Sequence, residues 1–160
     1  MLKDYQKRVI KDVEDFFGYL GTHRASGVPD FVSIGFAMNE KYRQFPDRPI
    51  TGKGKMYPRV CIKMPTGGGK TLVAVETIRA YQNLLANKKN GLVVWITHRE
   101  QIYRQTIENL QNKSHPYRQF LDQASGNRTL ILEKGQTLRR QDVEENLVVL
   151  MLMIQSATRD

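Results

Sequence analysis

The sequence predicts an α/β fold in which a mostly parallel sheet is flanked by helices on both faces. Apolar runs of strand length alternate along the 160 residues with segments whose apolar side chains recur at helical spacing. This alternation is typical of a parallel sheet that helices cover on both sides. A glycine run that ends in Lys-Thr, MPTGGGKT at residues 64–71, stands between a predicted strand and a predicted helix. That position predicts a phosphate-binding loop.

The chain before this loop divides into three segments. The spacing of apolar side chains in residues 1–20 predicts one amphipathic helix, which Gly18 and Gly21 should end. Turn-forming residues dominate residues 21–58, an insertion with no assigned role in which we expect one short helix. Residues 59–63, a short run with the β-branched Val60 and Ile62, predict a short buried strand that carries the lone cysteine, Cys61.

The core of the domain is predicted to lie in residues 59–160, where strands and helices alternate after the loop. In order, the expected elements are a helix over residues 70–88, a buried strand over 92–96, a helix over 99–112, a short helix over 117–123, a strand over 129–132, helical turns over 139–145 and an apolar strand over 147–154. Ligands of such sheets bind at the carboxyl ends of the strands. The loop, residues 97–99 and residues 155–158 are therefore expected to share one edge.

Composition narrows the class of protein. A formal net charge of +9 favours a polyanionic partner, although a solvated basic surface without such a partner remains the alternative on charge alone. One cysteine and three scattered histidines predict neither disulfides nor a metal held by protein side chains. The longest apolar stretch has eight residues, too few to span a bilayer, and the N-terminus lacks a secretory signal. We expect a cytoplasmic location and no contact with a membrane.

The residue types in the loop suit a triphosphate. Gly67, Gly68 and Gly69 have no Cβ atoms, so the backbone can take positive φ and bring its N–H groups close to phosphate oxygens. Lys70 would reach the outer phosphates, and the hydroxyl of Thr71 would bind Mg²⁺. With Thr66, these residues form the expected nucleotide-binding set. The alternative is a glycine-rich turn before an ordinary amphipathic helix.

Three segments, LKDYQ, MPTGGGKT and THREQIYRQT, together resemble the first motor domain of superfamily 2 helicases and translocases, a RecA-like P-loop NTPase. The resemblance is closest to the res (helicase and restriction) subunit of type III restriction enzymes, with type I enzymes similar. It implies ATP and Mg²⁺ as cofactors, double-stranded DNA rather than RNA as substrate, a methyltransferase subunit as partner and an associated endonuclease.

The resemblance also implies roles for individual residues. Gln6 matches a glutamine that contacts adenine, and an amide complements the adenine edge because it offers one donor and one acceptor. The residues that match nucleic-acid contacts of the family are His98, Arg99, Gln105, Gln155 and Ser156. The alternatives are an exposed helix glutamine at position 6, a solvated helix at 99–105 and a polar turn at 155–156.

Hydrolysis by this family requires an Asp-Glu pair, one carboxylate for Mg²⁺ and one for water, and no such pair follows Thr71. Glu133, at the end of a predicted strand, is a weak substitute. We therefore expect an N-terminal, partial motor domain with little or no turnover, in which residues 147–154 form an exposed sheet edge. The alternatives are an RNA or repair helicase, a nucleotide-binding module that never hydrolyses, and a small P-loop kinase.

Overall fold

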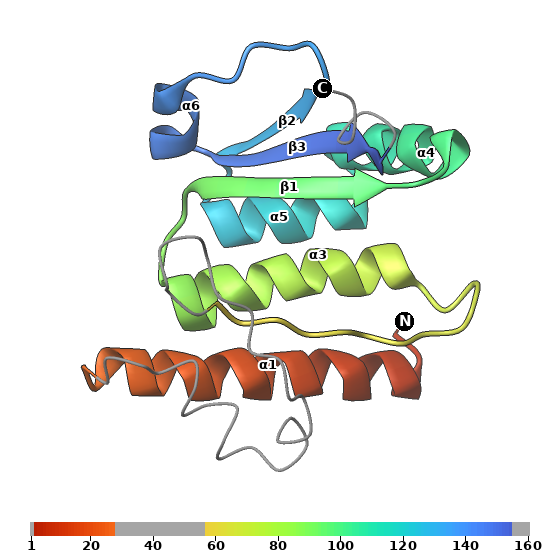
Figure 1. The fold of residues 1–160 in the computed structure, drawn as a ribbon. Coiled ribbons are helices and arrows are strands. Elements are labelled where there is room, and N and C mark those ends of the chain that lie inside the picture. Colours follow the sequence, from red (N-terminus) through yellow and green to blue (C-terminus); the bar gives the residue numbers. More distant parts are fainter. Residues whose placement is uncertain (1, 28–56, 155–160) are drawn as a thin grey trace.

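A computed structural model of the chain describes residues 2–27 and 57–154. In the view of Figure 1 the elements lie in layers, with α1 at one side, α3 next to it, and the sheet at the other side. The elements are α1 (Asp4–Ala25), α3 (Lys70–Ala80), η1 (Tyr81–Ala86, a π-helical segment), β1 (Gly91–Thr97), α4 (Glu100–Gln111), α5 (Pro116–Ser125), β2 (Thr129–Glu133), α6 (Arg140–Glu145) and β3 (Leu147–Met153).

The sheet has three parallel strands in the order β1-β3-β2, so the predicted α/β class with a parallel sheet is confirmed. The central strand is β3, which pairs with β1 through Leu147 and Gly91 and with β2 through Leu147 and Thr129. The expectation that residues 147–154 form an exposed edge is therefore wrong. Within the described residues the free edges belong to β1 and β2, because each of them pairs with β3 alone.

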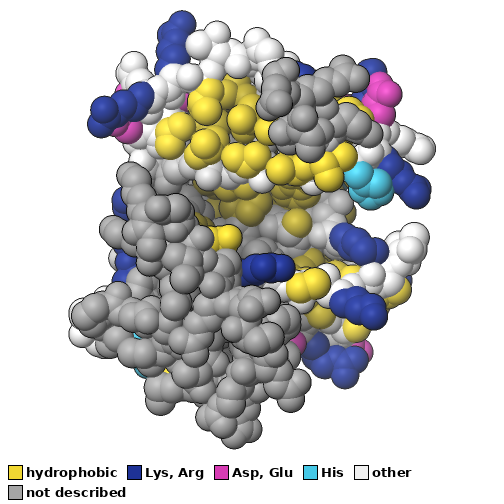
Figure 2. Space-filling model, in the orientation of Figure 1, with side chains coloured by type: hydrophobic (Ala, Val, Ile, Leu, Met, Phe, Trp, Pro, Cys, Tyr) yellow, Lys and Arg dark blue, Asp and Glu magenta, His cyan; other side chains and the backbone are white. Residues whose placement is uncertain are grey.

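The two faces of this sheet differ. Side chains of Leu147, Val149 and Met151 point to one face and pack with α3, α4 and α5 in the main core cluster. On the other face Leu92, Val94 and Ile96 of β1 keep 45%, 48% and 52% of their surface exposed. Figure 2 shows apolar side chains gathered over the strands on this side. The prediction that β1 is a buried strand is wrong, because its residues alternate between half-buried and exposed.

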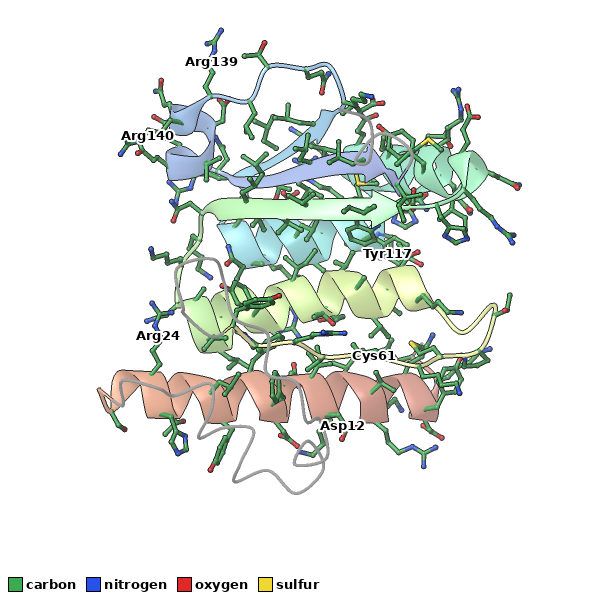
Figure 3. The ribbon with its side chains drawn as sticks, in the orientation of Figure 1. Asp12, Arg24, Cys61, Tyr117, Arg139 and Arg140 are labelled. Carbon is green, nitrogen blue, oxygen red and sulfur yellow. The ribbon has the colours of Figure 1, made fainter. Side chains whose placement is uncertain are left out.

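Helix α1 is longer than predicted, because Gly18 and Gly21 lie inside it rather than at its end. A Cβ at Gly21 would lie 1.9 Å from the carbonyl oxygen of Leu84. The glycine therefore permits close packing of α1 on η1 instead of ending the helix. Beyond it, the guanidinium of Arg24 donates to the carbonyl oxygen of Leu85 at 3.0 Å, and Figure 3 shows Arg24 directed toward that segment.

The helix that follows the loop is confirmed almost to its predicted end. It consists of α3 and, without a break, the π-helical η1, after which Asn87 takes a left-handed conformation with φ 50°. The later helices also match: Arg99 is the N-cap residue of α4, and α5 starts with Pro116 and ends before Gly126, whose φ is 66°. Proline at the first position and a left-handed glycine after the last are strong boundary signals.

Residues 59–63 do not form the predicted strand. They run extended between α1 and α3, but they pair with no strand among the described residues (Figure 1). Val60 and Ile62 pack against the cluster around Val13 and Phe16, whereas Cys61 is exposed (Figure 3). The prediction of a strand that buries Cys61 is therefore wrong, although Val60 and Ile62 pack against the core cluster.

The expected short helix around residues 31–45 and the candidate residues Gln155 and Ser156 lie outside the described ranges. Among the described helices, none combines the length and the apolar character needed to cross a bilayer. In the same ranges no group of three or more His, Cys, Asp or Glu side chains is placed to hold a metal ion.

Candidate functional site

The glycine loop leads into the first turn of α3, as predicted, but the residues before it, 59–63, are extended and not part of the sheet. Gly67 and Gly69 have φ values of 71° and 83°, a region that residues with a Cβ rarely adopt. Between them, Gly68 is buried, and its N–H donates to the carbonyl oxygen of Pro65 at 3.1 Å. The three glycines thus produce the tight turn that the motif requires.

The N-terminus of α3 faces out of this turn. Gly69 is the N-cap residue, and no side chain caps the helix there. The N–H of Val73 donates to the carbonyl oxygen of Gly69 at 3.1 Å. The N–H groups of the first helical turn have no intrahelical partner. Such groups, together with the helix dipole, attract anions.

Lys70 and Thr71 occupy the first two positions of α3. The ammonium group of Lys70 is exposed and donates to the carbonyl oxygen of Pro65 at 2.7 Å, so the side chain folds back over its own loop. Thr71 is half-buried, while Thr66 and Gly67 lie on the exposed side of the turn. A cation, free helix N–H groups and a hydroxyl therefore meet at one turn, and this donor set fits a triphosphate with its Mg²⁺.

The first turn of α1 contacts this loop through two side chains. Gln6 is only 7% exposed, and its amide donates to the carbonyl oxygen of Gly68 at 2.9 Å. The other end of the same amide accepts from the backbone N–H of Lys3 at 2.9 Å, a bond that closes the start of the helix. The hydroxyl of Tyr5 donates to the same Gly68 oxygen at 3.1 Å.

This arrangement adds to what the sequence indicated. The structure places Gln6 beside the loop, as the expected adenine contact requires, and gives its amide two protein partners. A Cβ at Gly69 would lie 2.4 Å from the amide nitrogen of Gln6, so these two residues are in close contact. The contact of Tyr5 was missed. It joins residues 63 positions apart, and its only sequence signal is the position directly before Gln6.

The second group of candidate residues lies where β1 ends, on the same side of the molecule as the loop (Figure 1). His98, Arg99 and Gln105 are all exposed, and Ile102 between them is 40% exposed. The opposite side of α4 is buried through Thr106, Ile107 and Leu110, and the last two pack in the core cluster with side chains of β3. The predicted contact residues therefore lie on the solvent side of a firmly packed helix.

Glu133 ends β2, the strand of the sheet farthest from the loop (Figure 1). It lines a groove of about 380 Å³ with Tyr103, Arg104 and Lys134. Burial, and next the nearby charge of Glu133, raise the pKa of Tyr103. Two strands separate this carboxylate from the free edge of β1, so Glu133 is poorly placed to act on a phosphate at the loop.

The family comparison agrees with this geometry. A model described as "Type III restriction enzyme, res subunit" matches residues 1–160. No curated protein and no solved structure matched the chain. The family is one of helicase-type ATPases with a P-loop fold, in keeping with the parallel sheet and the loop between residues 59–63 and α3. Since the match covers the whole sequence, the chain belongs to the type III restriction enzyme res subunit family.

Proposed function

We propose that residues 66–71 bind the triphosphate of ATP, with Mg²⁺ held through the hydroxyl of Thr71. The observation that carries this proposal is the left-handed Gly69 at an uncapped helix N-terminus, directly before Lys70. Bound Mg-ATP supplies the phosphoryl group that a motor of this family transfers to water. The backbone N–H groups of the loop hold its phosphates, and the Lys70 ammonium leaves the oxygen of Pro65 to neutralise them.

The adenine contact is part of the same proposal. Gln6 lies against Gly69, so its amide is close to a nucleotide whose phosphates occupy the loop. An amide nitrogen carries two protons and an amide oxygen two lone pairs. One proton of the Gln6 amide is donated to Gly68, and one lone pair accepts from Lys3. One proton and one lone pair are left for a base edge.

For nucleic acid, we propose that His98, Arg99 and Gln105 contact the backbone of double-stranded DNA, with Gln155 and Ser156 as further contacts. Support comes from the exposure of the first three, their position at the carboxyl edge of the sheet and the net charge of +9. Contacts of this kind position the strand and carry no sequence information.

A motor would couple the two sites within the restriction assembly, alongside a methyltransferase subunit and an endonuclease. Hydrolysis needs one carboxylate for Mg²⁺ and one for water, and these residues contain no Asp-Glu pair after Thr71. We therefore propose binding, with little or no turnover, for the 160 residues by themselves. The same observation supports a nucleotide-binding module as the second candidate.

Isothermal titration with Mg-ATP tests the proposal. The unaltered chain should bind, and Lys70→Ala should lose most of the affinity because the cation that faces the phosphates is gone. Lys89→Ala is a matched control, since Lys89 is an exposed lysine in the loop after η1, where its ammonium donates to the Asn83 side chain at 3.3 Å. Equal binding by the unaltered chain and Lys70→Ala would argue against a P-loop role.

A further inference from the structure

Two donors from the first turn of α1 converge on one carbonyl group of the glycine loop. The Tyr5 hydroxyl lies 3.1 Å and the Gln6 amide nitrogen 2.9 Å from the oxygen of Gly68. Gly68 is buried, so its carbonyl needs partners, and the two side chains occupy both of its lone pairs. The bond of Gln6 to the N–H of Lys3 prevents its amide from turning away.

The orientation of this carbonyl also fixes the next N–H group. The described residues contain no cis peptide bond, and in a planar trans peptide the C=O and the following N–H point in opposite directions. With the oxygen of Gly68 held toward α1, the N–H of Gly69 must point away from α1. Gly69 caps α3, so this N–H joins the unpaired donors of the first helical turn.

We propose that Tyr5 is a positioning residue for phosphate binding, because its hydroxyl holds the Gly68–Gly69 peptide with the N–H of Gly69 on the phosphate side. This inference rests on the proposed binding of a triphosphate by the loop. The peptide between Gly68 and Gly69 is easy to rotate, since a glycine has several accessible conformations. A second donor beside Gln6 reduces that freedom before the ligand arrives, and preorganised donors raise affinity.

The aromatic ring of Tyr5 has a separate, structural role. It packs with Leu2 and Val9 on the small cluster formed by Ile10, Met64 and Val73. Tyr5→Phe keeps this packing and removes only the hydroxyl. Tyr19→Phe is the matched control, because Tyr19 lies on the same helix, its ring contacts His23, and no hydroxyl bond is found for it among the described residues.

The experiment is isothermal titration of the 160-residue chain and both variants with Mg-ATP and with Mg-tripolyphosphate, which has no base. Tyr5→Phe should weaken both ligands by the same factor, about two- to tenfold, as expected for the loss of one hydrogen bond. Tyr19→Phe should bind like the unaltered chain. A common factor identifies an effect on the phosphates, whereas a change in stability alone would leave both affinities unchanged.

Several results would overturn the inference. If Tyr5→Phe binds both ligands as tightly as the unaltered chain, the inference is wrong but the proposed function stands. The same holds if Tyr5→Phe weakens the binding of Mg-ATP and not that of Mg-tripolyphosphate. Binding of neither ligand by the unaltered chain would remove both proposals. If Tyr5→Phe does not fold, the inference is tested by NMR on the unaltered, ¹⁵N-labelled chain, by following the amide resonance of Gly69 as ligand is added. A downfield shift with tripolyphosphate supports the inference, and an unmoved resonance contradicts it.

Discussion

The glycine loop and the start of α4 lie on the same side of the molecule, but they are built differently (Figure 1). The loop is held from α1 by Tyr5 and by the buried Gln6. At the start of α4, Arg99 and Gln105 are exposed. Side chains that hold the buried carbonyl group of Gly68 contribute to folding as well as to binding, whereas exposed side chains contribute to binding alone. The two regions should therefore respond differently to substitution.

Substitution of Gly69 should have the largest effect. In Gly69→Ala the alanine would have to adopt a φ of 83°, and its Cβ would lie 2.4 Å from the Gln6 amide nitrogen. We expect a loss of about 1–3 kcal/mol in the free energy of unfolding, and a larger loss of nucleotide binding. Gly67→Ala is the control: its φ is 71°, but nothing lies within 4 Å of the added Cβ. Chemical denaturation of both variants measures the difference, and equal stabilities would contradict the packing of Gln6 on the loop.

A matched pair of glutamines comes next. Gln6→Leu leaves the N–H of Lys3 without a partner and the oxygen of Gly68 with one donor fewer, at a cost of about 1–3 kcal/mol in the free energy of unfolding. Gln105→Leu changes an exposed side chain, so stability should stay within about 0.5 kcal/mol. Urea denaturation measures both. The distinction between the regions fails if the two variants lose similar stability.

The smallest change in stability is expected for Arg99→Ala. This exposed side chain should affect only the binding of duplex DNA, lowering affinity and reducing the slope of log K against log salt by about 1. Arg140→Ala removes the same charge from α6, at the opposite end of the strands (Figure 3). Fluorescence anisotropy with labelled DNA at several salt concentrations compares them. An equal loss in both variants would indicate general charge attraction rather than a site at α4.

Local signals in the sequence were sufficient for much of this structure. The loop with its positive φ values, the helices α4 and α5 and the strands β1, β2 and β3 follow from glycine positions and apolar periodicity. These features depend on neighbours within a few residues, which is why a single sequence reveals them.

The errors concern partners that are distant in the chain. Residues 59–63 have the composition of a strand, but a ladder needs a second strand, which the described residues do not provide. Gly21 resembles a helix end, whereas its role depends on Leu84 of η1. The central position of β3 and the bond from Tyr5 to Gly68 likewise depend on tertiary packing. Periodicity carries no information about such contacts.

Thermal unfolding with and without Mg-ATP tests the central claim, phosphate binding at the glycine loop, most directly. At a ligand concentration of about 100 Kd, binding to the folded state alone adds about 2.7 kcal/mol, or roughly 5–10 °C in Tm for a chain of this size. Lys70→Ala should show no such shift. An unchanged Tm of the unaltered chain at saturating Mg-ATP would contradict the account.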